Sequence, residues 1–185
     1  MTLIRFGQAA VLATAFAAFS PLPLLAAGGG GSVAPKPTQT TKECKTGKVW
    51  SDKKKRCVNP ENSGLSDDAL YHAVRELAYS GRLEEAQRVL AAMPDQSDDR
   101  VLTYWGFTHR KLGNVELGMT YYQKALAANP DNHLARSYKG QAHVEAGDLV
   151  LARAELLQIR VRGGSGTWAE QSLTNAIETG ATYNF

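Results

Sequence analysis

Histidine and cysteine are the side chains of this sequence with the clearest chemical potential. His109 and His143 occupy equivalent places in two segments of similar pattern, which raises the question of a metal site. His72 and His133 have no carboxylate or cysteine at the spacing of His-Glu-x-x-His or a similar ligand set. The sequence also lacks Gly-x-x-x-x-Gly-Lys-Ser, Gly-x-Ser-x-Gly and a pair of catalytic carboxylates. It therefore predicts a protein that is not an enzyme and needs no metal or cofactor.

Cys44 and Cys57 are the only cysteines. An even pair at short spacing predicts a disulfide when the chain is exported. Two cysteines make a poor zinc site, because structural zinc usually takes four Cys or His ligands and no histidine lies nearby. Closing a loop of this length would constrain the unfolded chain by roughly 3 kcal/mol. We therefore predict a Cys44 to Cys57 bond.

The segment around these cysteines, residues 42–60, is predicted to form a small basic hairpin. Residues 48–50 and 56–58 are expected to be strands, and the polar run 51–55 is expected to turn between them. An anionic polymer or a glycan could contact the tip through one aromatic and four basic side chains: Trp50, Lys53, Lys54, Lys55 and Arg56. The sequence favours the alternative, in which Trp50 packs on the disulfide and the basic run is a solvated turn.

Residues 1–27 have the pattern of a secretory signal peptide. A basic start at Arg5, an apolar stretch from 9 to 19 and small residues at 25–27 follow the expected order. The alternative is an uncleaved membrane anchor, which needs roughly 20 uninterrupted apolar residues, and Pro21 and Pro23 interrupt the run. Gly28 follows the expected cleavage point, so no cysteine is available there for lipid attachment. The sequence favours an exported, periplasmic protein over one anchored to the inner membrane.

Composition and charge indicate one globular domain with short appendages. Of 185 residues, 43% are hydrophobic and 21% charged, and the formal net charge is +3. The positive surplus is concentrated in residues 28–60, and no nucleic-acid motif accompanies it, so the sequence does not predict a nucleic-acid binder. Residues 28–41 are rich in Gly, Pro, Thr and Ser and are expected to be a flexible linker.

From residue 65 onward, apolar residues recur at helical spacing, which predicts an all-α domain over 65–162. The pattern divides into three helix pairs, over about 66–96, 98–130 and 132–162, followed by a capping helix over 167–179 and a tail over 180–185. Three glycines, Gly81, Gly113 and Gly147, stand at the hinge of each pair, 32 and 34 residues apart (81 to 113 and 113 to 147). Such a period predicts an open stack of helical hairpins, each burying its apolar face on its neighbours.

The middle pair carries a recognisable motif. Leu102, Trp105-Gly106 and His109 are spaced as in W-x2-L-G-x2-Y, and Gly118, Tyr122, Ala125 and Pro130 follow at the expected intervals. This pattern resembles the tetratricopeptide repeat (TPR) family, and the chain looks like an exported bacterial member with a short disulfide module in front. His109 and His143 replace the packing aromatic of the motif, which indicates structural histidines. Arg136 and Lys139 depart from the pattern, because the family usually buries large apolar groups there; either their stems pack and their charges reach water, or the third repeat is looser.

The resemblance implies a concave groove, lined by the first helix of each pair, that binds a partner peptide or helix. Carried over position by position, the groove would comprise Tyr71, Arg75, Thr103, Tyr104, Phe107, Arg110, Lys111, Ser137, Tyr138 and Gln141. Tyr and Arg often dominate binding energy at interfaces. Tyr71 and Arg75 stand where some members carry a carboxylate clamp, which argues against a chaperone-tail receptor.

The sequence thus predicts a protein-binding adaptor or scaffold of the bacterial cell envelope whose partner is another envelope or secreted protein. The alternative is a glycan-binding or peptidoglycan-binding protein that acts through the basic hairpin. A further alternative is a self-assembling structural subunit, because an open solenoid can stack through its ends. The oligomeric state and the identity of the partner do not follow from the sequence.

Overall fold

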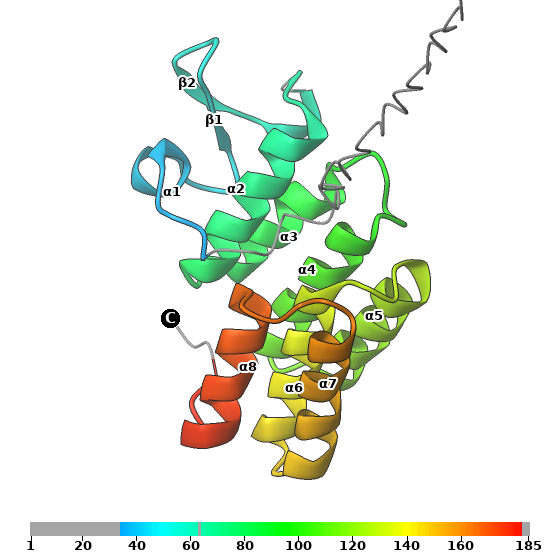
Figure 1. The fold of residues 1–185 in the computed structure, drawn as a ribbon. Coiled ribbons are helices and arrows are strands. Elements are labelled where there is room, and N and C mark those ends of the chain that lie inside the picture. The colour runs from blue at the N-terminus through cyan, green and yellow to red at the C-terminus, as the bar shows by residue number, and fades with distance from the viewer. Residues whose placement is uncertain (1–33, 63, 183–185) are drawn as a thin grey trace, which may run out of the picture.

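The structure, a computed structural model, describes residues 34–62 and 64–182. Within these residues the chain forms eight α-helices, one short 3-10 helix and one two-stranded sheet (Figure 1). The expected signal peptide, the first part of the expected linker and the last three residues of the tail lie outside this range. None of the helices in the described part of the chain is both long and apolar enough to cross a membrane.

The predicted basic hairpin is confirmed. β1 (Val49–Ser51) pairs antiparallel with β2 (Arg56–Val58), and Trp50 stands opposite Cys57 in the register. A disulfide joins Cys44 to Cys57, with the two Cα atoms 5.6 Å apart. The 3-10 helix η2 (Pro60–Asn62) then leads toward the helical domain.

The segment expected to be a flexible linker ends earlier than predicted. Residues 39–41 belong to α1 (Gln39–Glu43), which is capped by Thr38. Glu76, on the second helix, accepts hydrogen bonds from the backbone amides and the hydroxyls of Thr38 and Thr41. Glu76 is only 6% exposed, so four donors satisfy a charge that burial alone would disfavour. The composition of residues 28–41 could not indicate this docking, because the acceptor, Glu76, lies more than thirty positions further along the chain.

Seven further helices confirm the predicted all-α domain. They are α2 (Asp67–Tyr79), α3 (Leu83–Ala91), α4 (Asp99–Lys111), α5 (Val115–Ala128), α6 (His133–Glu145), α7 (Leu149–Val161) and α8 (Trp168–Thr179). Ser66, Asp98 and Asn132 cap the first helix of each pair with side-chain oxygens. Gly81, Gly113 and Gly147 have φ of 75°, 90° and 78°, a left-handed conformation that only glycine adopts without strain.

The helices pack as antiparallel pairs, α2 with α3, α4 with α5 and α6 with α7, and the pairs follow one another down the molecule (Figure 1). α8 packs on both α6 and α7. The tightest approach is between α4 and α5: a Cβ placed on Gly106 would lie 2.5 Å from Tyr122 Cε1, and one on Gly118 would lie 2.8 Å from the Gly106 carbonyl oxygen. Two glycines at the crossing therefore allow the pair to close over the Tyr122 ring.

Candidate functional site

The side chains predicted to line an open groove are instead buried inside the helical stack. Nine of the ten are no more than 5% exposed, and Lys111 is half-buried. The buried nine are Tyr71, Arg75, Thr103, Tyr104, Phe107, Arg110, Ser137, Tyr138 and Gln141. The expectation of an accessible groove at these residues is therefore wrong, for two physical reasons: the aromatic rings fill it, and α8 covers it.

The rings form a continuous cluster between the first helices of the three pairs. Tyr104 packs edge-on against Tyr71 and Tyr138, with centroids 5.7 and 6.1 Å apart. Phe107 lies 4.7 Å from Tyr138 and is stacked on Tyr79 at 6.0 Å. Tilted and edge-on pairs at these distances add stabilisation beyond the area they bury. The cluster is therefore a core that joins the three pairs.

Hydrogen bonds satisfy the polar ends of this aromatic cluster. Tyr79 and Tyr138 share a bond of 2.6 Å between their hydroxyls, and Arg75 Nε donates to Tyr104 OH at 3.3 Å. Burial raises the pKa of Tyr71 to about 12 and raises that of Tyr138 well above the usual tyrosine value. These hydroxyls stay neutral at all physiological pH values, which suits a structural role.

α8 covers the concave side of α6 because small residues let the two helices approach. Ser137 and Ser172 are 2.9 Å apart through their hydroxyl oxygens. A Cβ on Gly140 would lie 2.6 Å from Leu173, so this leucine occupies the space that a side chain would need. At the start of α8, Trp168 Nε1 donates to Tyr79 OH at 2.9 Å. The predicted capping helix thus closes the groove as well as ending the stack.

A polar cluster lies at the C-terminal ends of α4 and α6. Arg110 Nη1 and Lys111 Nζ lie 2.9 and 3.0 Å from the two carboxylate oxygens of Glu145. Thr182, in the tail, contacts the same carboxylate and Lys111. Burial raises the pKa of Glu145, but the charge of Arg110 and the bonds from Thr182 and Lys111 outweigh it, so its pKa is lowered overall. Two of the three cations expected in the groove, Arg110 and Lys111, are therefore held by an internal carboxylate.

Arg136 and Lys139, the departures from the repeat pattern, are paired with one carboxylate on the neighbouring helix. Their nitrogens lie 3.2 and 2.7 Å from the two oxygens of Glu155 on α7. All three side chains are at most 22% exposed. The third pair is therefore joined by a charge cluster where the family pattern has apolar packing.

The histidines do not form a metal-binding group within the described residues, and His109 is packed among aromatic rings. His109 packs against both Trp105 and Tyr121, with ring centroids 5.6 and 5.5 Å away, and these two rings pack on each other at 6.0 Å. Burial lowers the pKa of His109 and of His143. Within residues 34–62 and 64–182 no three His, Cys, Asp or Glu residues are grouped so that they could hold a metal ion.

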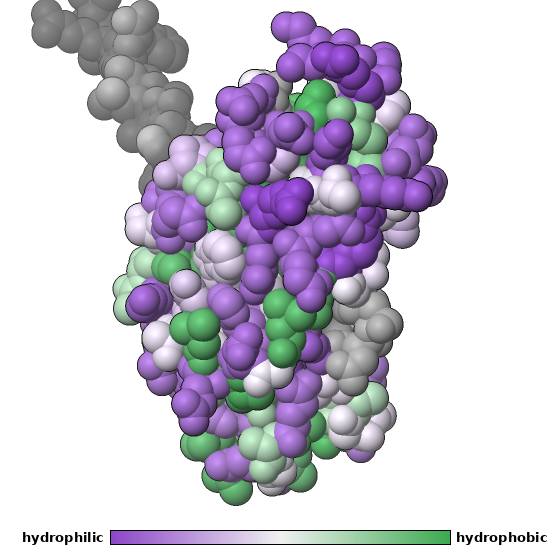
Figure 2. Space-filling model, turned by 180° about the vertical axis from the view of Figure 1, so that it is seen from behind, coloured by the Kyte–Doolittle hydropathy of each residue, from purple (hydrophilic) through white to green (hydrophobic). Residues whose placement is uncertain are grey.

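The basic turn of the hairpin is exposed at one end of the molecule. Lys53, Lys54, Lys55 and Arg56 are all exposed, and Trp50 is half-buried, with its Nε1 donating to Asp52 at 3.2 Å. Figure 2 shows the end of the molecule that carries the hairpin as mostly hydrophilic. The basic run is therefore accessible to solvent, as both predictions for it require.

An exposed apolar stripe that was not predicted from the sequence lies on the outer face of α7. Val150 is 75% exposed, Leu157 57% and Val161 66%, and Ala154 is exposed between them. Residues at i, i+4, i+7 and i+11 lie on one side of a helix, so these four form a continuous ridge. The opposite side of α7 packs inward through Ala152, Leu156 and Ile159. We call these four residues the α7 stripe.

Comparison with the other second helices shows how unusual the α7 stripe is. The equivalent positions on α5, counted from the hinge glycines, are Glu116, Thr120, Gln123 and Ala127, and all four are exposed. On α3, Glu84 and Arg88 are at the first two of these positions and are likewise exposed. Aligning the three pairs would have revealed this contrast in the sequence.

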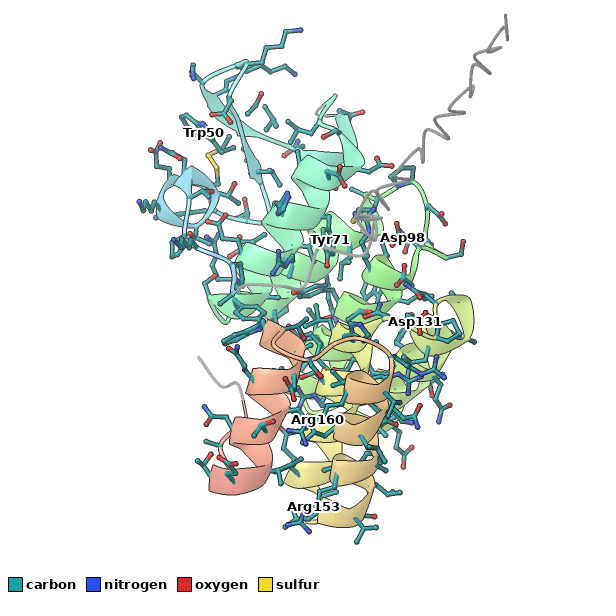
Figure 3. All side chains as sticks on the ribbon, in the orientation of Figure 1. Trp50, Tyr71, Asp98, Asp131, Arg153 and Arg160 are labelled. Atoms are coloured by element: carbon teal, nitrogen blue, oxygen red, sulfur yellow. A yellow bond between two sulfur atoms is a disulfide. The ribbon has the colours of Figure 1, made fainter. Side chains whose placement is uncertain are left out.

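A cleft of about 310 Å³ lies beside the α7 stripe, between α7 and α8. Its apolar lining comes from Leu156, Leu157 and Ile177, and its polar lining comes from Arg153, Arg160, Thr174 and Glu178. In Figure 3, Arg153 lies near one end of the stack and Arg160 higher on the same helix. Because Leu157 belongs to both features, the stripe and the cleft form one surface.

Comparison of the chain with protein-family models, with curated proteins and with solved structures found no match in any of the three.

Proposed function

We propose that this protein is an exported, TPR-like adaptor of the bacterial cell envelope, which binds another envelope or secreted protein through the outer face of α7 and the adjoining cleft. The observation that carries the proposal is the α7 stripe. Contiguous apolar side chains on a water-exposed helix are costly for a protein that stays alone, and such patches commonly mark interaction sites.

Several features support the TPR-like assignment. The helix pairs have the expected lengths and left-handed hinge glycines, and Gly106, Gly118 and Tyr122 meet at the crossing of α4 and α5. The closed concave side moves the proposed binding surface away from the usual groove. The disulfide is compatible with export, and periplasmic location is part of the proposal.

A crosslinking pull-down from a native envelope extract tests this function. The wild-type protein is compared with Val150→Glu/Leu157→Gln, which places on α7 the residues found at the equivalent positions of α5. Glu116→Ala/Gln123→Ala on α5 is the matched control. We expect the α7 variant to lose the proteins that the wild type and the control both capture. Equal capture by all three would refute the proposed site.

A second candidate function is suggested by the exposed basic turn of the hairpin, which could bind an anionic cell-wall polymer. If it does, wild-type protein should pellet with isolated cell wall, and Lys53→Glu/Lys55→Glu should remain in the supernatant. This pair of changes leaves the disulfide and both strands intact. Wild-type protein that never pellets would exclude this role.

A further inference from the structure

The disulfide module, residues 34–62, carries an excess of positive charge at its surface. It has eight basic and three acidic residues, a net charge of +5, whereas residues 64–182 have twelve basic and fifteen acidic residues, a net charge of −3. All eight cations of the module are exposed: Lys36, Lys42, Lys45, Lys48, Lys53, Lys54, Lys55 and Arg56. The positive charge is thus concentrated in one small part of the molecule.

The carboxylates by which the helical domain contacts the module do not balance this charge. Glu76 accepts its hydrogen bonds from two threonines of the module. Glu85 lies 2.6 Å from Arg82 Nη2 and also accepts from the backbone amide of Gly47. Both carboxylates are therefore occupied by groups other than the eight exposed cations.

The acidic residues of the module itself offset only part of the charge. Asp52 accepts a hydrogen bond from the Trp50 indole, and Glu43 and Glu61 are exposed. With Lys54 set aside, none of the eight cations forms an ion pair with a described residue. An anion from outside can therefore reach them without displacing an internal carboxylate.

The module holds its cations on a fixed frame. Arg82 Nη1 and Nη2 donate to the carbonyl oxygens of Thr41 and Cys44 at 3.2 and 2.7 Å, and Arg88 Nη1 donates to that of Thr46 at 2.7 Å. These bonds and the disulfide fasten α1 and the hairpin to α3. A preorganised set of charges loses less conformational entropy on binding than a flexible basic tail does.

A cleft of about 510 Å³ beside the disulfide separates the cations into groups. Lys42 and Lys45 line it together with the Arg82–Glu85 ion pair, whose two charges cancel. Four other cations, at residues 53–56, are on the exposed turn of the hairpin, from which side chains ending in nitrogen extend outward in Figure 3. The cleft is large enough for one sugar-sized unit.

Cations arranged in this way fit a flexible polyanion better than a small anion or a membrane. A small anion would reach only one group, and contacts with a few solvated lysines are individually weak. A bilayer surface is flat, so it could contact the turn but not enter the cleft. A flexible chain can place one unit in the cleft and others at the turn, and linked contacts of this kind strengthen one another.

We infer that the disulfide module binds a flexible anionic polymer, with one carboxylate or phosphate group in the cleft beside Lys42 and Lys45 and further groups at the turn of residues 53–56. This inference rests on the second candidate function and adds to it the cleft and the chemistry of the ligand. The turn supplies long-range attraction, and the cleft favours a chain over a surface.

Two fluorescein-labelled polymers test this inference: polyphosphate, which carries phosphate groups, and polygalacturonate, which carries carboxylates. Binding to the full-length oxidised protein is measured by fluorescence anisotropy. We expect at least one polymer to bind, with an affinity that falls roughly tenfold or more when the salt concentration rises about fourfold, because binding releases counterions. Inorganic phosphate and galacturonate at the same concentration of charge should not compete. The polymer that binds more tightly identifies the anionic group.

Variants assign the binding to the two groups of cations. Lys42→Gln/Lys45→Gln should weaken polymer binding by about fivefold, the range of two exposed charge contacts. Lys53→Glu/Lys55→Glu reverses two charges and should weaken it by about tenfold or more. The control, Lys124→Gln/Arg162→Gln, removes two exposed charges from the helical domain and should leave the affinity unchanged. All these side chains are exposed, so we expect unchanged circular dichroism.

The outcomes separate this inference from the second candidate function. If the wild type pellets with cell wall but Lys42→Gln/Lys45→Gln binds both polymers as tightly as the control does, the candidate function stands and the inference is refuted. If the wild type neither pellets nor binds either polymer, both fail. Tighter binding to phosphatidylglycerol vesicles than to either polymer, unaffected by Lys42→Gln/Lys45→Gln, would identify a membrane surface as the ligand and overturn the inference.

Discussion

The concave side of the helical stack and the outer face of α7 are opposites in composition and exposure. The concave side is rich in Tyr and Arg, the residue types that often dominate interfaces, yet its side chains are buried and bonded to one another. The outer face of α7 carries Val, Ala and Leu, an ordinary core composition, yet it is exposed. Residue type alone therefore does not identify the accessible surface of this protein, because exposure decides which side chains are available to a partner.

The largest expected effect is on the concave side. Tyr138→Ala should lower the free energy of unfolding by about 3–5 kcal/mol, because it removes a fully buried ring from the centre of the aromatic cluster. Chemical denaturation monitored by circular dichroism measures it. A loss below about 1 kcal/mol would mean that the concave side is open. The contrast with the exposed outer face of α7 would then not hold.

The corresponding stability test on the outer face of α7 is the double substitution Val150→Glu/Leu157→Gln. These side chains are 75% and 57% exposed, so the free energy of unfolding should stay within about 0.5 kcal/mol of the wild type. A large loss would show that the α7 stripe is already covered within the protein.

A substitution at Gly140 should expose the concave side, which is buried in the wild type. Gly140→Val places a side chain where Leu173 lies and should cost about 1–3 kcal/mol by overpacking. α8 should then detach, so hydrogen exchange should accelerate in α8 and at Ser137 and Gln141. Ala154→Val adds similar bulk on exposed α7 and serves as the control. Unchanged exchange in α8 would contradict the view that this helix closes the groove.

Mild acid should affect the packed interior more than the outer face. Burial lowers the pKa of His109, His133 and His143, so the folded state binds fewer protons than the unfolded chain. Their contribution to stability is complete above the unfolded pKa, about 6.5, and is lost as the pH falls through the lower folded values. Denaturation at pH 7.5 and pH 5.5 should therefore show a drop, smaller in His109→Asn. The same drop should persist in Val150→Glu/Leu157→Gln, and equal stability at both pH values would refute the histidine contribution.

The local features of the fold were predictable from the sequence, and the long-range ones were not. Capping residues, hinge glycines and helical periodicity located the seven helices of the domain, because these signals act within a few residues. The disulfide followed from two cysteines alone. The docking of α1 on Glu76 depends on a partner almost forty positions away, as the bonds from Thr38 and Thr41 show, and no local pattern encodes it.

The candidate site was misplaced for a related reason. The repeat resemblance assigned each groove residue to a side of its helix, but it contained no information on where α8 would pack. Gly140, Ser137 and Ser172 allow that approach, and small residues of this kind are common on any helix. The α7 stripe was detectable, because Val150 and Leu157 differ from Glu116 and Gln123 at the same repeat positions.

The hydrogen bond from Trp168 to Tyr79 connects residues 89 positions apart and has a consequence for how the chain folds. In a simple solenoid each repeat contacts only its neighbours, so folding can start anywhere and spread one repeat at a time. Here the last helix contacts the first pair, and the core around Tyr79 and Phe107 is complete only when both ends of the domain are present. During synthesis, therefore, the contact between Tyr79 and Trp168 cannot form until α8 has left the ribosome.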